Sequence, residues 1–208
     1  MRLVWWGGLL GSRNSLPRFI AARFYYPYLA FQNPPLEPKC SSDGKWVYYA
    51  NWEAQQIERV STEGGESQPV PGSAMPNNNA TLALAPDGTL LAIFSVRVAA
   101  GRPVKKVALV SLDVGSKPKE RLLDPDPRAV GPLEFTPSGN AVVYLVRESG
   151  TDNLWLQPLD GSGGRQITNF LADSIVQFQF SPDGKNLCIL RAHNDSEVVL
   201  LRDSGPVQ

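Results

Sequence analysis

The sequence of 208 residues has little of what most catalytic and metal sites are built from. It contains one histidine, two cysteines and two methionines, and its 20 basic and 20 acidic side chains give a formal net charge of zero. The absence of a basic excess counts against a nucleic-acid-binding domain. Cys40 and Cys188 lie far apart in apolar, strand-like stretches, which fits neither a disulfide framework nor a Cys/His metal site. We expect both to be small buried hydrophobic residues.

The sequence also lacks a hydrophobic run long enough to span a bilayer. The longest, Leu3 to Gly11, is about half of the roughly 20 residues that a transmembrane helix requires. Residues 1–31 contain four arginines, no acidic residue and eight of the 19 aromatic residues. Four interpretations of this stretch stay open: a weak signal peptide, a basic aromatic interfacial segment, an irregular lead-in, and sequence foreign to the native domain. We treat residues 1–35 as a divergent basic and aromatic N-terminal segment.

Turn residues, in contrast, are abundant, and they recur at a fixed period. The 18 glycines and 18 prolines leave few windows for a helix of average length. Four tetrads combine a residue that can accept a backbone hydrogen bond with a glycine, as tight hairpins require. Their glycines are 44, 51 and 45 residues apart, close to the period of a four-stranded propeller blade. The tetrads are Ser41–Gly44, Ala85–Gly88, Thr136–Gly139 and Ser181–Gly184.

Strand-like segments follow each tetrad at matching positions. The third, fourth and fifth residues after each glycine are apolar in all four units, which indicates a strand covered on both faces. A second strand-like run follows, and in the first three units a short outer strand as well. We therefore predict an all-β fold, a β-propeller of four recognisable four-stranded blades that is partial or open, with the last blade lacking its outer strand. The predicted blades are residues 36–72, 80–124, 131–169 and 174–205.

Several of these spaced elements together resemble the WD40-like repeats of the TolB-type β-propellers. They are Ser181-Pro182-Asp183-Gly184-Lys185, Leu154-Trp155 followed by Leu159-Asp160-Gly161, and Arg165-Gln166-Ile167-Thr168. The resemblance covers residues 36–205, with Ser42 in place of the first turn proline and Ser138 in place of the third turn aspartate. The end of the chain is similar to the C-terminal propeller of bacterial sensor proteins that carry a Ser/Thr kinase or winged-helix DNA-binding domain.

The resemblance implies six blades, whereas the sequence shows four units. We favour a chain that is the C-terminal part of a larger six-bladed propeller. Divergent structure from residues 1–35 and an open ring completed by a partner are the alternatives. On the first interpretation the isolated chain exposes apolar blade faces, so we expect self-association.

Residues with catalytic or ligand-binding potential are few. His193 is the only histidine and no Gly-x-Ser-x-Gly motif occurs, so a serine triad is disfavoured and an exposed loop histidine is expected. Calcium binding by the turn aspartates is less favoured than a turn-forming role, which needs no metal. A basic cluster is interpreted as a solvated hairpin tip in preference to an anion site. The aspartates are Asp43, Asp87 and Asp183, and the cluster is Arg97, Arg102, Lys105 and Lys106.

The sequence therefore predicts a non-catalytic propeller module without catalytic, cofactor or metal residues. Its loops would bind a protein partner or a small ligand, with no nucleic acid and no membrane span. The resemblance implies a bacterial, extracytoplasmic or periplasmic location and a sensory or interaction role in a larger protein. The alternative function is an accessory propeller segment of a prolyl-oligopeptidase-like serine peptidase.

Overall fold

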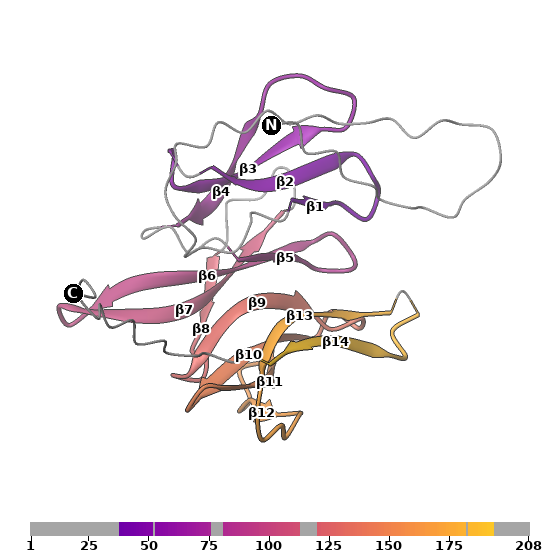
Figure 1. The fold of residues 1–208 in the computed structure, drawn as a ribbon. Helices are drawn as coiled ribbons and strands as arrows, with labels where there is room; N and C mark the ends of the chain where they lie inside the picture. Colours follow the sequence, from indigo (N-terminus) through magenta and orange to yellow (C-terminus); the bar gives the residue numbers. More distant parts are fainter. Residues whose placement is uncertain (1–37, 52, 76–80, 113–119, 182, 194–208) are drawn as a thin grey trace, which may run out of the picture.

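The computed structural model describes residues 38–51, 53–75, 81–112, 120–181 and 183–193. All regular structure in these ranges is β, and it forms four separate antiparallel sheets that follow one another along the chain (Figure 1). Three sheets have four strands and the fourth has two. The predicted all-β propeller class is confirmed, and within the described residues the array does not close.

Within each sheet the strands pair in chain order, each antiparallel to the next. The first sheet holds β1 (Lys39–Cys40), β2 (Trp46–Asn51), β3 (Gln56–Ser61) and β4 (Gln68–Ala74). The second holds β5 (Leu82–Leu84), β6 (Leu90–Ala99), β7 (Arg102–Ser111) and β8 (Glu120–Leu123). The third holds β9 (Ala129–Phe135), β10 (Ala141–Glu148), β11 (Thr151–Pro158) and β12 (Arg165–Gln166). The fourth holds β13 (Ser174–Phe180) and β14 (Leu187–Ala192), and the further strand predicted near residues 198–201 lies outside the described residues.

The core consists of three apolar layers, one between each pair of successive sheets. Ile57 and Ile93 belong to the layer between the first and second sheets. Phe94 and Tyr144 meet edge to face between the second and third, with ring centroids 5.6 Å apart. Phe178 packs with Leu145 and Leu154 between the third and fourth. The second and third sheets thus bury both of their faces, as the continuous apolar runs predicted.

The fourth sheet departs from that prediction. Phe178 and Ile189 pair across β13 and β14 and face the third sheet, whereas Cys188 and Leu190 alternate with them and are exposed, Leu190 by 58%. Cys40 in β1 is exposed too, so the expectation that both cysteines are buried is wrong. The reason is that their strands are covered on one face only within the described part of the chain.

A side-chain bridge joins the first and third sheets past the second. Lys39 Nζ in β1 lies 2.7 Å from Glu134 Oε1 in β9, and both side chains are about one quarter exposed. Because β1, β5 and β9 are the first strands of three consecutive sheets and β5 contacts both of the others, these strands converge at one edge of the array. The sheets therefore radiate from a common line, as propeller blades do.

The four tetrad turns stack on one another in a fixed direction. In each turn the glycine N–H donates to the carbonyl of the first tetrad residue at 2.8–2.9 Å. A Cβ added to each later glycine would meet the second residue of the preceding turn. The nearest atoms to the added Cβ are Ser42 Oγ at 3.2 Å for Gly88, Pro86 Cδ at 3.7 Å for Gly139, and Pro137 Cβ at 2.7 Å for Gly184. Gly44, in the first turn, has no described atom within 4 Å of that position.

This stacking predicts unequal effects of one substitution at two equivalent turns. Gly44 and Gly184 have the same φ of +69°, so an alanine at either position carries the same backbone strain of about 1–2 kcal/mol. Gly184→Ala also forces its Cβ against Pro137, which we expect to cost about 1–3 kcal/mol more. Urea unfolding of the two variants measures the difference, and equal losses would contradict the stacking.

Candidate functional site

The array has two ends with different chemistry. The turn end carries the four tetrads, and the hairpin end carries the β2–β3, β6–β7 and β10–β11 hairpins together with the connections from one sheet to the next. Loops at the ends of rigid sheets are where propellers place recognition. A hollow lies at each of these two ends of the third sheet.

A buried carboxylate links the third and fourth sheets at the hairpin end. The side chain of Asp152 in β11 is fully buried, and its two oxygens accept hydrogen bonds of 2.7 and 2.9 Å from the guanidinium of Arg147 across the hairpin. Asp152 also accepts the backbone N–H of Ile175 at 3.0 Å. The carboxylate raises the pKa of Arg147, because hydrogen bonds to Asp152 favour the charged guanidinium. Asp152 thus fixes the start of β13 against the third sheet.

A second carboxylate continues this network onto β14. Asp173 pairs with Arg191 at 2.9 Å and with Nδ1 of His193 at 2.6 Å. The Arg191 guanidinium also lies 4.1 Å from the centre of the Phe170 ring, within range of a cation–π contact. The His193 side chain is 68% exposed, as expected of a loop histidine, and its contact with Asp173 binds it into the surface.

Arg128 forms the other half of the hairpin-end surface. It donates to Asp126 at 2.9 Å and to Glu148 at 2.6 Å, and it lies 5.7 Å from the centre of the Trp155 ring. The Arg128 hydrogen bond lowers the pKa of Asp126. Tyr144 supports this loop, because its hydroxyl accepts the backbone N–H of Asp126 at 3.0 Å, and burial raises the pKa of Tyr144 to about 12.

We call these residues the charged rim, and two of them, Arg128 and Glu148, line a small hollow. The rim comprises Asp126, Arg128, Arg147, Glu148, Asp152, Asp173, Arg191 and His193. The hollow has a volume of about 250 Å³, and its lining includes Arg128, Glu148 and the Leu171 side chain, which is 90% exposed. Each side chain of the rim holds a partner, and all but the fully buried Asp152 are at least partly exposed, so this end offers a fixed pattern of charges beside one exposed apolar side chain.

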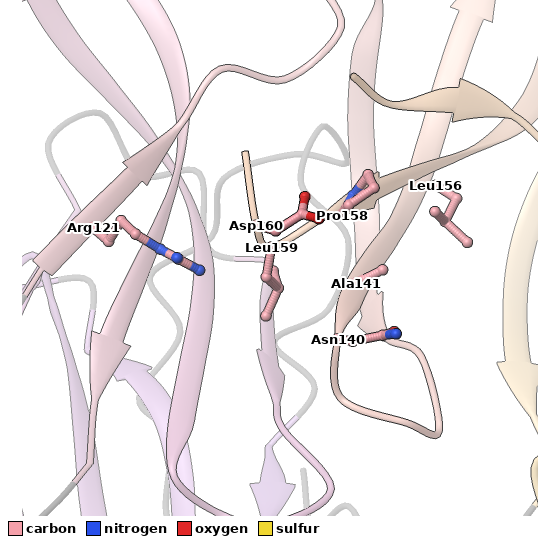
Figure 2. A pocket seen from close by; sticks show the side chains of 7 residues that line it. All are labelled: Arg121, Asn140, Ala141, Leu156, Pro158, Leu159 and Asp160. Atoms are coloured by element: carbon pink, nitrogen blue, oxygen red, sulfur yellow. The ribbon is translucent and has the colours of Figure 1, made fainter. Parts of the chain in front are cut away.

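The hollow at the turn end lies between the second and third sheets and measures about 450 Å³ (Figure 2). Arg121 of β8 lines one side, and Asp160, just after β11, lies across the cleft from it. The Ser162 hydrogen bonds, with a smaller contribution from Arg121, lower the pKa of Asp160. The remaining lining residues are Asn140, Ala141, Leu156, Pro158 and Leu159. The lining contains no histidine, cysteine or hydroxyl side chain, so it offers no nucleophile with an adjacent base.

The structure disperses the predicted basic cluster of the second sheet. Arg97 pairs with Glu120, Lys106 pairs with Asp124, and Lys105 donates to the Ala129 carbonyl of the next sheet. Burial lowers the pKa of Lys105. Three of the four cations therefore link strands and sheets instead of forming an anion site.

The tetrad aspartates act in their turns. Oδ1 of Asp43, Asp87 and Asp183 accepts the backbone N–H two residues further along at 3.0–3.1 Å. Each also accepts a serine or threonine hydroxyl from its own turn. These bonds lower the pKa of all three carboxyls. Within the described ranges no three histidine, cysteine or acidic side chains gather as a metal site would need, and no helix there is long and apolar enough to cross a membrane.

The charged rim was not predicted from the sequence, although one part of it had a signal. Arg147 and Asp152 face each other across a hairpin whose turn is Ser149-Gly150, a spacing that the sequence displays. Asp173, Arg191 and Phe170 meet only because the connection between the sheets folds back along β14. No spacing rule indicates such a contact.

The arrangement of radiating four-stranded sheets identifies the class of the fold as a β-propeller array, and comparison with solved structures identifies the type. TolB from Acinetobacter baumannii is 18% identical over 81% of this chain and 40% of its own, with a TM-score of 0.60. An oligogalacturonate lyase from Vibrio parahaemolyticus is 16% identical over 74% of this chain and 46% of its own, with a TM-score of 0.57. The fold is that of the TolB-like propellers.

A structure of a nidogen–laminin complex shows the same likeness, with 16% identity over 71% of this chain and 53% of its own and a TM-score of 0.52. The chain thus spans 40–53% of the length of these three structures. No protein-family model matches the sequence, and no curated protein does. Since one of the similar structures is a lyase by name, the fold leaves the question of catalysis to the site.

We predict that Asp152 contributes more to stability than an exposed ion pair of the same array. Asp152→Ala leaves the buried N–H of Ile175 without its acceptor and Arg147 without its partner, which we expect to cost about 1–3 kcal/mol in the free energy of unfolding. Asp124→Ala is the control, because Asp124 is 80% exposed in its pair with Lys106 and its loss should cost about 1 kcal/mol or less. Equal losses in urea unfolding would show that Asp152 does not hold the sheets together.

The raised pKa of Tyr144 predicts that the protein loses stability at alkaline pH. The folded pKa of Tyr144, about 12, is above the ordinary value of 10, so its contribution is fully present below pH 10 and is lost as pH rises from 10 through about 12. We expect the free energy of unfolding of the wild type to fall more steeply across this window than that of Tyr144→Phe. Denaturant unfolding at several pH values measures both slopes, and parallel curves would contradict the assignment.

Proposed function

We propose that the chain is a non-catalytic binding module that holds a protein partner at the charged rim. The observation that supports this most is the rim itself, where paired charges are held by bonds to rigid strands beside the exposed Leu171. Fixed charges of both signs next to an apolar contact favour a protein surface with a complementary pattern over a polyanion. Pre-organised side chains also reduce the entropy lost on binding.

The cleft at the turn end supports the non-catalytic part of the proposal. Arg121 and Asp160 are the only charged side chains in its lining, and the Asp160 carboxylate already accepts the backbone N–H of Ser162 at 2.8 Å. The resemblance to TolB-type repeats supports an extracytoplasmic bacterial location and a sensory or interaction role within a larger protein.

The binding surface is tested with peptides selected from a random displayed library against the whole chain. We expect Leu171→Asp to weaken the selected peptides by about tenfold or more, as the loss of one apolar contact of about 1.4 kcal/mol requires. Val98→Asp is the matched control, because Val98 is 78% exposed on the β6–β7 hairpin and does not line the hollow beside Leu171. Peptides that instead lose affinity with Arg121→Ala would place binding in the cleft of Figure 2 and contradict the proposal.

The non-catalytic part is tested separately. We expect oligogalacturonate and a p-nitrophenyl ester to react with the chain present no faster than in buffer alone. Turnover that Arg121→Ala or Asp160→Asn abolishes would overturn the proposal and assign chemistry to the turn-end cleft.

A further inference from the structure

The contact between successive sheets is one interface used three times. In each case the strands of one sheet present an apolar face to the next, and the later turn places its glycine beside the second residue of the earlier turn. The interface is therefore directional, because each sheet uses one face toward its predecessor and the other toward its successor.

The fourth sheet has its predecessor but no described successor. Its successor face carries Gln177, Gln179, Cys188 and Leu190, which alternate with the buried Phe178 and Ile189. Cys188 and Leu190 are exposed there, and Val176, at the bulge in β13, is 55% exposed as well. An adjacent sheet would remove this apolar surface from water.

Among the described residues, the first sheet has a successor but no predecessor. Gly44 is the one tetrad glycine around which the described residues leave open space where a preceding turn would lie. The face of β2 and β3 turned away from the second sheet carries Val47 and Val60, which pair across the strands and are only half-buried. This sheet thus offers the strand face and the glycine turn that a successor of the fourth sheet must have.

We propose that the fourth sheet of one molecule packs against the first sheet of a second copy of this chain, so that the array continues head to tail. The occupant is a second copy because its first sheet supplies both halves of the interface that the array already repeats. A formal net charge of zero adds no repulsion between copies. Such a contact between unlike faces closes into a ring if the rotation allows, and otherwise extends as a filament.

The first test is the mass of the whole chain in solution across a range of concentrations. We expect species at two or more times the 22.7 kDa of one chain, and their loss in Leu190→Glu. Val98→Glu, on a more exposed residue of another sheet, should assemble as the wild type does. A wild type that stays monomeric overturns the proposal, as does equal disruption by both variants, which would indicate unspecific aggregation.

Cys188 reports on the same face directly. In a Cys40→Ser background, where Cys188 is the only thiol, we expect a maleimide to react with it about tenfold more slowly in the assembled wild type than in the Leu190→Glu variant. An assembled wild type whose Cys188 reacts at the rate of the variant places the contact elsewhere and overturns the proposal. So does a slow Cys188 in a monomer, which would show that the chain covers this face itself.

Mixing two variants tests the direction. Leu190→Glu keeps an intact first sheet and Val47→Glu an intact fourth sheet, so each alone should be monomeric and an equimolar mixture should form one-to-one dimers. Val60→Glu replaces Val47→Glu if circular dichroism shows that the latter is unfolded. Dimers of Val47→Glu or Val60→Glu alone would indicate contact between two fourth sheets and contradict the head-to-tail arrangement. Failure of these tests leaves the rim proposal untouched, since Leu171 belongs to neither face.

Discussion

The structure depends on the burial of apolar sheet faces between neighbours. A four-stranded sheet of about 40 residues has two faces and cannot bury either alone, so each unit is stable only when another sheet lies against it. The second and third sheets satisfy this requirement on both sides, and their central strands are the most completely buried part of the described chain. The ion pairs and turn contacts that join one sheet to the next form only once the sheets are packed in this way.

Most of this architecture could be predicted from the sequence because it is periodic. The spacing of the four turn glycines, together with the apolar residues at matching positions after them, predicts the number of sheets and the order of their strands. What could not be predicted depends on contacts between units. Cys188 follows the same column as Ala92 and Val143, yet those two are fully buried and it is exposed, because a column cannot show whether a neighbour is present. Lys105 stands among basic residues that the sequence suggests are solvated. It links two sheets because β9 lies close enough for its ammonium group to donate to the Ala129 carbonyl.

The candidate site was the least predictable part for a related reason. The residues of the charged rim are ordinary charged side chains without a motif, and none requires a catalytic or metal-binding interpretation. They become a surface because Asp152 and Asp173 bring two sheets into one hydrogen-bonded unit. Recognition by such a surface depends on how firmly the sheets hold one another, so binding and stability at this end of the molecule share the same residues.

The stacked turns give the array a polarity with a consequence for how it can change. The second and third tetrads each carry a residue that receives the next glycine and a glycine that meets the previous turn, so a complete unit brings both halves of the joint with it. Gene duplication of one whole unit would therefore lengthen the array without disturbing the joints on either side, whereas a cut within a unit would separate the two halves. Gain or loss of whole repeats therefore disturbs the contacts between turns less than a change within a repeat does.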